Sequence, residues 1–246
     1  DMRKQLMLIR PEWSKDSKHL FYARSVDDVY YIASLNIATG QMYAHLFSSL
    51  GTSAVSPDGK WLASLIEADS DKVLLTLNRI DGSAHKYYKL DLEMDGGQGL
   101  FLTLMWAPDS KHILVPVKEE FWLVDADTGD IKKYGDPSRD KIAYPTFSLV
   151  DNKLYYVAIR ESADPNAPEE TVSLKCMNLE DRKTRTVFQL SNLPDISDGG
   201  ILSISPNGKM VLLRCVMEDK SGNKKSALIF WDGKTQKIVE TDPLAD

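Results

Sequence analysis

The sequence is poor in the residues that most often build catalytic and metal sites. It has two cysteines and four histidines among 246 residues. It contains neither a Cys-x-x-Cys pair, which would suggest zinc, nor the Gly-x-Ser-x-Gly elbow of a serine hydrolase. Cys176 and Cys215 lie on different predicted strands, so we expect two buried thiols, with a disulfide as the alternative. The sequence therefore predicts no catalytic residues, no metal site and no cofactor.

Positive charge and long apolar runs are also scarce. Lysine and arginine number 30 against 36 aspartates and glutamates, which gives a net charge of −6. Surfaces that bind nucleic acid are basic, so we expect no nucleic-acid partner. No apolar run approaches the roughly 18 residues that a transmembrane helix needs, so we expect no membrane span.

What the chain has instead is a five-residue unit that recurs five times. Each copy ends on lysine and is followed by an apolar, strand-like run. The copies are Ser14-Lys15-Asp16-Ser17-Lys18, Ser56-Pro57-Asp58-Gly59-Lys60, Ala107-Pro108-Asp109-Ser110-Lys111, Leu149-Val150-Asp151-Asn152-Lys153 and Ser205-Pro206-Asn207-Gly208-Lys209.

The unit has the composition of a tight hairpin turn. In the second copy Pro57 presets φ near about −65°, and Asp58 can accept a hydrogen bond from its own backbone. Gly59 then fits a left-handed position at no steric cost. The other copies place Ser17, Ser110, Asn152 and Gly208 there, and the two serines are expected to bear a small strain.

The spacing of the unit divides the chain into repeats of four short strands. We place the repeats at about residues 6–47, 50–90, 100–134, 142–190 and 201–241 of one domain, residues 1–246. Each repeat predicts an antiparallel sheet with two apolar faces, and both faces need neighbouring sheets. The expected fold is therefore all-β, a β-propeller of four-stranded blades with five repeats visible.

The strings SPDGKWLAS, APDSKHILV and SPNGKMVLL, which begin at Ser56, Ala107 and Ser205, resemble the WD40-like (PD40) repeats of TolB-type propellers. The resemblance covers nearly the whole chain, but its motif residues shape a turn and do no chemistry. It implies a propeller in the bacterial periplasm or cell exterior. Propellers of this family usually have six or seven blades, so the five repeats either close a ring themselves or belong to a larger one.

Other residues repeat at the same positions. Trp13 and Trp106 both precede the unit, so we expect them to pack between blades. His19 and His112 both follow it, so we interpret them as structural residues.

Acidic residues gather in the connections opposite the repeated unit, where propeller loops usually bind. We therefore predict a non-catalytic, protein-binding scaffold that takes up a basic segment of another protein. The alternatives are an ordinary solvated surface, the propeller portion of a larger enzyme such as a prolyl oligopeptidase-type serine peptidase, and a carbohydrate-binding propeller. The candidate partner-binding residues are Glu67, Asp69, Asp71, Asp91, Glu93, Asp95, Glu161, Asp164, Glu169 and Glu170.

Overall fold

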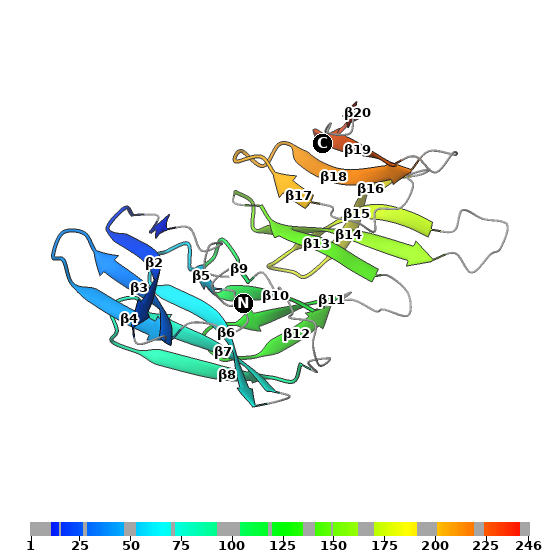
Figure 1. Ribbon diagram of the computed structural model, residues 1–246. Helices are drawn as coiled ribbons and strands as arrows, with labels where there is room; N and C mark the ends of the chain where they lie inside the picture. The colour runs from blue at the N-terminus through cyan, green and yellow to red at the C-terminus, as the bar shows by residue number, and fades with distance from the viewer. Residues whose placement is uncertain are drawn as a thin grey trace. The chain divides into compact units, whose positions relative to one another are not determined.

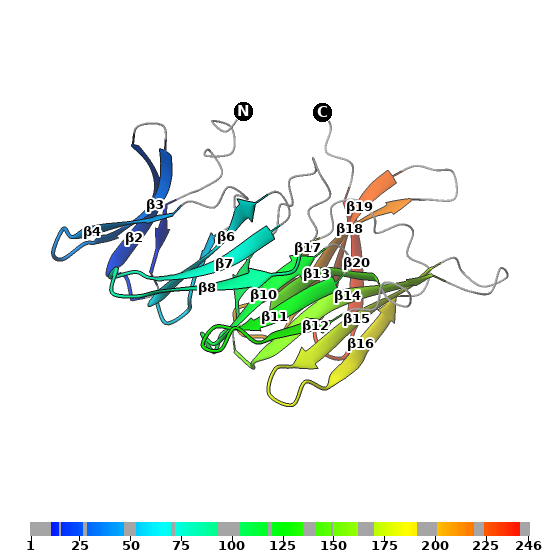
Figure 2. The same cartoon turned by 90° about the horizontal axis from the view of Figure 1, so that it is seen from below.

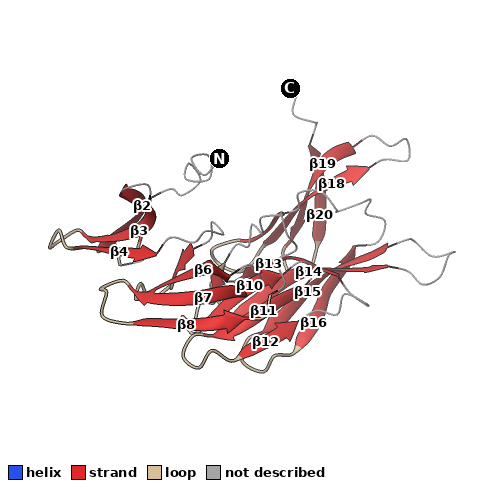
Figure 3. Cartoon of the chain, turned by 60° about the horizontal axis from the view of Figure 1, so that its bottom comes forward, coloured by secondary structure: helices blue, strands red, loops and turns tan. Residues whose placement is uncertain are grey.

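The computed structural model consists of five four-stranded antiparallel sheets, which we number 1 to 5 in chain order (Figure 1). Every regular element among the described residues is a strand (Figure 3), and no helix that could cross a bilayer occurs among them. The all-β prediction is confirmed. The structure describes residues 11–14, 16–26, 29–46, 53–69, 72–92, 104–117, 120–134, 141–148, 150–161, 170–190, 201–218 and 224–241.

The chain divides into two compact units, residues 1–117 with 122–132, and residues 118–121 with 133–246. Unit 1 contains sheets 1 and 2 and most of sheet 3. Sheet 1 has β1 (Glu12–Trp13), β2 (His19–Val26), β3 (Val29–Asn36) and β4 (Met42–Leu46). Sheet 2 has β5 (Ser53–Val55), β6 (Trp61–Asp69), β7 (Lys72–Arg79) and β8 (His85–Leu90). Sheet 3 has β9 (Met105–Trp106), β10 (His112–Val117), β11 (Glu120–Asp125) and β12 (Ile131–Tyr134).

Unit 2 contains sheets 4 and 5. Sheet 4 has β13 (Lys141–Phe147), β14 (Lys153–Glu161), β15 (Glu170–Asn178) and β16 (Thr184–Leu190), which lie side by side in chain order (Figure 2). Sheet 5 has β17 (Ile201–Ile204), β18 (Val211–Glu218), β19 (Lys224–Trp231) and β20 (Gln236–Thr241). The sequence did not predict the irregularity in β13, where the register shifts between Ala143 and Thr146 and Tyr144 has a φ of 53°. The expectation that all five sheets make one domain stays a prediction.

The left-handed residue of each motif turn lies where the sequence predicts it. Ser17, Gly59, Ser110, Asn152 and Gly208 have φ values of 58°, 69°, 57°, 51° and 67°. In the second turn the N–H of Gly59 donates to the carbonyl of Ser56 at 2.8 Å. This bond and the left-handed residue together form the tight reversal that the composition indicates.

A serine at the first position of the turn completes a small hydrogen-bond network. Ser56 Oγ donates to Asp58 Oδ1 at 2.6 Å and accepts from the N–H of Trp61 at 3.0 Å. The N–H of Lys60 donates to the same Asp58 oxygen at 3.1 Å. The first and fifth turns repeat this pattern, and the fifth uses Asn207 in place of an aspartate. The motif residues therefore serve the turn, as expected.

The turn of the fourth copy begins at Ser148, one residue before Leu149, where the sequence alignment placed its start. The N–H of Ser148 donates to the carbonyl of Lys153, just as the N–H of Ser14 donates to the carbonyl of His19. Lys153 is therefore the first residue of its strand, and the prediction that it ends the turn is wrong. The reason is that the left-handed residue comes three residues after Ser14 but four residues after Ser148.

The lowered pKa of a turn carboxylate predicts that the protein loses stability in acid. Burial acts to raise the pKa of Asp58, but hydrogen bonds from Ser56 and Lys60 outweigh it, so the pKa is lowered. Because the folded pKa lies below the unfolded value of about 3.9, the stabilisation is complete above that pH and is lost as the pH falls through the folded pKa. We expect the free energy of unfolding to fall between about pH 5 and pH 2, and to fall less steeply in Asp58→Asn. Urea titrations across this range test this, and an equal slope in both proteins would contradict it.

In unit 1, the turn between the third and fourth strands of sheets 2 and 3 packs on the preceding sheet. A Cβ added to Gly82 of sheet 2 would lie 2.6 Å from Cδ1 of Tyr43 in sheet 1, and one added to Gly129 of sheet 3 would lie 2.3 Å from Cδ1 of Tyr88 in sheet 2. Both glycines also have positive φ, 72° and 79°. Each glycine is therefore required by its backbone conformation and by the neighbouring ring.

Hydrogen bonds link the same parts of these sheets. Ser34 Oγ of sheet 1 donates to the carbonyl of Ile80 in sheet 2 at 2.8 Å. Tyr88 Oη of sheet 2 donates to the carbonyl of Ala126 in sheet 3 at 3.0 Å. Ile80 and Ala126 are equivalent, because the N–H of each donates to the last residue of its own motif turn. The two interfaces therefore repeat one design.

The two equivalent tryptophans have different environments. Trp106 is buried, with 7% of its surface exposed, and its Nε1 donates to the carbonyl of Ala54 in sheet 2 at 2.9 Å. Its predicted packing between blades is confirmed. Trp13 is 59% exposed, so the same prediction is wrong for it. The physical difference is that Trp106 packs on the preceding sheet, sheet 2, whereas no sheet comes before sheet 1 among the described residues.

In unit 2, sheets 4 and 5 enclose a separate apolar cluster that includes Val157, Leu174, Leu213 and Ile229. A Cβ added to Gly208 would lie 2.3 Å from Cγ2 of Val150, so the motif turns of these two sheets touch closely. Each sheet of the pair therefore buries one face against the other.

Candidate interaction site

Two kinds of connection lie at opposite ends of every sheet. Because neighbouring strands are antiparallel, the motif turn and the turn between the third and fourth strands lie at one end. The connection between the second and third strands lies at the other end, together with the exit from the fourth strand. We call the first the turn end and the second the loop end of a sheet.

The structure brings three of the predicted residues together at the loop end of sheet 2. Glu67 pairs with Val73 on the neighbouring strand, and Val73 pairs in turn with Leu90 on β8. Asp69 closes β6, and Asp91 directly follows β8. The backbone positions of these three residues thus lie at one end of one sheet, and their role in binding stays a prediction.

Lysines accompany these acids. Asp69 pairs with Lys72 in the strand register. Lys89 Nζ lies 3.3 Å from Asp91 Oδ1, and the side chain of Asp91 is 82% exposed. The ion pair of Lys89 was not predicted, although the sequence signal is simple: residues two apart at the end of a strand lie on the same face. The loop end of sheet 2 is therefore only partly acidic.

The loop end of sheet 4 has a different character. Glu161 is the last residue of β14, Glu170 is the first of β15, and the two are directly paired across the strands. The side chains of both glutamates lie outside the described residues. The remaining predicted residues, Asp71, Glu93, Asp95, Asp164 and Glu169, lie outside the described residues.

Aspartates at the turn end are already engaged. Asp81 accepts hydrogen bonds from the hydroxyl and the N–H of Ser83, which lower its pKa. Backbone N–H groups of Thr235 and Lys234 lower the pKa of Asp232 to about 2. Such carboxylates hold the turns in shape, so the loop end is the better candidate for recognition.

The histidines and the described cysteine have structural environments. Burial would raise the pKa of Asp109, but the hydrogen bond from His112 Nδ1 at 2.7 Å and those from the N–H groups of Lys111 and His112 together outweigh it, so the pKa is lowered. His45 is buried on β4 against Ser34, and burial lowers its pKa. Cys176 is a buried free thiol, as expected, and burial raises its pKa, so it stays protonated near neutral pH. Cys215 lies on β18 and its side chain is outside the described residues.

Among the residues that the structure describes, no three histidines, cysteines, aspartates or glutamates come close enough together to hold a metal ion. A pocket of about 310 Å³ in sheet 4 is lined by Cys176, Lys153, Asp181, Arg185 and neighbouring residues. Two of its lysines are held in ion pairs, Lys153 with Asp151 and Lys183 with Asp181, so the pocket is part of the turn-end network.

No protein-family model and no curated protein matches the sequence. Solved structures do resemble it. TolB from Acinetobacter baumannii is 16% identical with a TM-score of 0.54, over 95% of this chain and 54% of that one. The β-propeller domain of the Trilobed protease from Pyrococcus furiosus is 17% identical with a TM-score of 0.58, over 89% and 66%. Porphyromonas gingivalis dipeptidyl peptidase 4 is 14% identical with a TM-score of 0.55, over 98% and 42%.

The chain thus spans less than two thirds of the length of each of these three structures. At such low identity the likeness concerns the fold alone. It agrees with the five four-stranded sheets and with the repeated turn. The chain is therefore a β-propeller module with sheets like those of TolB and of peptidase propellers.

Proposed function

We propose that the chain is a non-catalytic scaffold that binds another protein through the acidic loop ends of its sheets. The recognition residues are Glu67, Asp69 and Asp91 in sheet 2 and Glu161 and Glu170 in sheet 4, with Asp71, Glu93, Asp95, Asp164 and Glu169 beside them in the sequence. The partner is a lysine- or arginine-rich segment, and the setting is the periplasm or the cell exterior. The net charge of −6 favours attraction of such a segment.

The observation that supports this proposal best is the pairing of Glu161 with Glu170. A hairpin normally avoids like charges at facing positions, because they destabilise it by about 0.2–1 kcal/mol. A basic partner would turn this cost into attraction. The turn-end aspartates cannot do so as readily, since their oxygens already accept hydrogen bonds from the turns.

The test variant reverses one charge at the loop end of sheet 4, and the control variant reverses one charge at its turn end. We expect Glu170→Lys to weaken binding of a lysine-rich peptide by at least about tenfold at low salt, since it removes one acid and adds a repelling cation. It should not lower the melting temperature, because it relieves the pairing with Glu161. Fluorescence anisotropy of the labelled peptide and thermal unfolding measure the two effects.

The matched control is Glu180→Lys, which makes the same change of net charge at the turn end of the same sheet, where Glu180 is exposed. We expect this variant to bind the peptide almost as wild type does. If both variants lose affinity equally, the attraction comes from overall charge and the proposed site is wrong.

A second candidate function is the propeller portion of a larger enzyme. It is supported by the likeness to dipeptidyl peptidase 4, of which the chain spans 42%. In that role the loop ends would position substrate for a catalytic domain. The complete open reading frame separates the two candidates, because a downstream hydrolase domain would favour the second.

A further inference from the structure

The pocket of about 310 Å³ in sheet 4 lies on the side of that sheet that packs against sheet 5. Tyr155, Cys176 and Arg185 are paired in turn across β14, β15 and β16, so their side chains lie on one face. Tyr155 and Cys176 belong to the apolar cluster that sheets 4 and 5 share. Both sheets belong to unit 2, so the pocket is formed within one compact unit.

Polar side chains continue this face at the turn end of sheet 4. Asn178 pairs with Lys153 on β14, and its N–H donates to the carbonyl of Lys183. These three residues line the pocket together with Cys176 and Arg185. The pocket therefore begins where the apolar contact between sheets 4 and 5 ends.

In sheet 2 a tryptophan fills the equivalent space. Trp61 corresponds to Lys153, because the carbonyl of each accepts the N–H of the serine that opens its own turn. Cζ of Arg79 and Nζ of Lys86 lie 5.4 Å and 5.2 Å from the centre of the Trp61 ring. The ring and the two cations together occupy the turn end of this face of sheet 2.

Sheet 4 lacks this packing. Lys153 brings no ring, and its ammonium group is held by Asp151 in the turn before it. Asn178 stands at the position of Arg79, since each is the strand partner of the residue that follows the motif turn. The loss of one aromatic ring and one long side chain accounts for the pocket.

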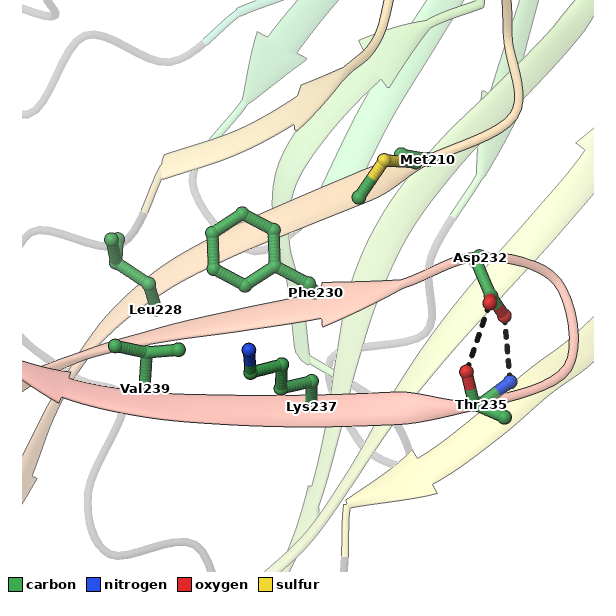
Figure 4. Close-up of a pocket in the computed structure, with 7 residues that line it drawn as sticks. All are labelled: Met210, Leu228, Phe230, Asp232, Thr235, Lys237 and Val239. Carbon is green, nitrogen blue, oxygen red and sulfur yellow. Dashed lines mark hydrogen bonds between the residues drawn. The ribbon is translucent and has the colours of Figure 1, made fainter.

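The turn between the third and fourth strands of sheet 5 is also short. The hydrogen bond that closes this turn spans five residues in sheets 2 and 3, but in sheet 5 it runs from the N–H of Asp232 to the carbonyl of Thr235. The carboxylate of Asp232 also accepts from the N–H and the hydroxyl of Thr235 (Figure 4). Gly82 and Gly129 touch the preceding sheet, but nothing lies within 4 Å of a Cβ added to Gly233. Within the described residues, sheet 5 therefore does not cover the turn end of sheet 4 as sheet 3 covers that of sheet 2.

Arg185 is the cation that this difference leaves without an acidic partner. It corresponds to Lys86, because each follows by two residues the carbonyl that closes its turn. Lys86 Nζ donates to the carbonyl of Ala126 and to Asp127 Oδ1 in sheet 3, both at 3.1 Å. Arg185 is exposed, and no ion pair joins it to a carboxylate in the part of the chain that the structure describes.

The pocket is positive overall. Its charged lining residues are three cations and one carboxylate, Lys153, Lys183, Arg185 and Asp181. Asp181 is held by its own turn, since it accepts the N–H of Lys183 at 3.0 Å and lies 3.6 Å from Lys183 Nζ. Asn178 Oδ1 accepts the N–H of Glu180 at 2.8 Å, so the amide nitrogen of Asn178 remains as a donor. The lining therefore offers hydrogen-bond donors to a negatively charged group.

We propose that this pocket binds a small oxyanion, a phosphate or a carboxylate group, with Arg185 as its principal donor. The planar fork of a guanidinium matches both groups, because two of its N–H donors can bind two oxygens at once. Lys183 and Asn178 add further donors beside it. A volume of about 310 Å³ suits a small ligand or the charged end of a larger one. The site is separate from the loop ends, so it does not depend on the proposed scaffold function.

The test is a heteronuclear NMR titration of the isotope-labelled chain with inorganic phosphate, and separately with acetate, at constant ionic strength. We expect the amide signals of Lys153, Asn178 and Arg185 to shift and to saturate with a dissociation constant of about 1 mM or below for phosphate. Phosphate should bind more tightly than acetate, because it carries more charge. Equally tight binding of acetate would also support an oxyanion site and would assign it to carboxylates.

Arg185→Gln is the decisive variant. It should raise the dissociation constant for phosphate at least about tenfold, because it removes the fork and its charge. Arg185 is exposed, so the variant should remain folded, and circular dichroism checks this. The matched control is Lys132→Gln, which removes one charge at the equivalent exposed position of sheet 3, outside the pocket. This control should bind phosphate as wild type does.

Two results overturn the proposal. One is the absence of saturable shifts at the pocket amides with either anion up to about 50 mM. The other is a dissociation constant that Arg185→Gln leaves unchanged, or changes no more than Lys132→Gln does.

Discussion

Gly129→Ala is expected to lower the free energy of unfolding by about 2–4 kcal/mol, of which about 1–2 comes from the left-handed backbone and the rest from overpacking. The added Cβ would lie 2.3 Å from Cδ1 of Tyr88, which is closer than two non-bonded carbon atoms can approach. The ring cannot simply move away, because Tyr88 Oη donates to the carbonyls of Ala126 and Asp127. The turn or the ring must shift, and the interface between sheets 2 and 3 loosens.

Urea denaturation followed by tryptophan fluorescence measures this loss. Gly40→Ala is the matched control, since Gly40 has a φ of 71° but open space around it. It should cost only the backbone part, about 1–2 kcal/mol. Adding Tyr88→Ala to Gly129→Ala should give less than the sum of the single effects, because the clash is removed. Equal losses in Gly129→Ala and Gly40→Ala would show that the tyrosine contact is unimportant.

Trp106→Ala is expected to cost about 3–5 kcal/mol, the range for truncating a buried large aromatic residue. Trp106 packs with Leu75 and Ile113 in the core between sheets 2 and 3. The change also leaves the carbonyl of Ala54 without the indole N–H that it accepts at 2.9 Å. Both effects act on the same interface.

Trp13→Ala is the natural comparison, because Trp13 occupies the same repeat position and is 59% exposed. At low protein concentration it should change the free energy of unfolding by no more than about 0.5 kcal/mol. Denaturation of both variants at one dilute concentration makes the comparison. A large loss in Trp13→Ala under these conditions would mean that the side chain is covered within a single chain.

The turn chemistry made most of this fold predictable. Asp58 followed by Gly59 specifies a local conformation with few alternatives, and so do Asn207 and Gly208. The apolar run after each turn predicts the next strand, and the four short strands of each repeat predict one antiparallel sheet. In the fourth copy, which lacks the serine and the proline of this pattern, the left-handed position of Asn152 was still predicted, but the strand begins at Lys153, one residue earlier than predicted.

The candidate site was less predictable. Strand ends can be placed from the turns, which is why Glu67 and Asp91 were expected at one end of their sheet. Charge pairing depends on register and side-chain direction, which composition does not give, so the Lys89–Asp91 ion pair and the facing of Glu161 and Glu170 appeared only in the structure. The environment of Trp13 depends on whether another sheet precedes it, and repeat position alone cannot tell that.

Among the described residues, each strand of the five sheets is hydrogen-bonded only to strands that come just before or after it in the chain. No sheet has to wait for a distant segment, so each one can form as soon as its own residues, 30 to 50 or so, have left the ribosome. Synthesis would then proceed as a series of completed hairpins, and within each unit a new sheet would close on the one made before it. Few unpaired strand edges would be present at any moment, which limits the opportunity for aggregation during translation.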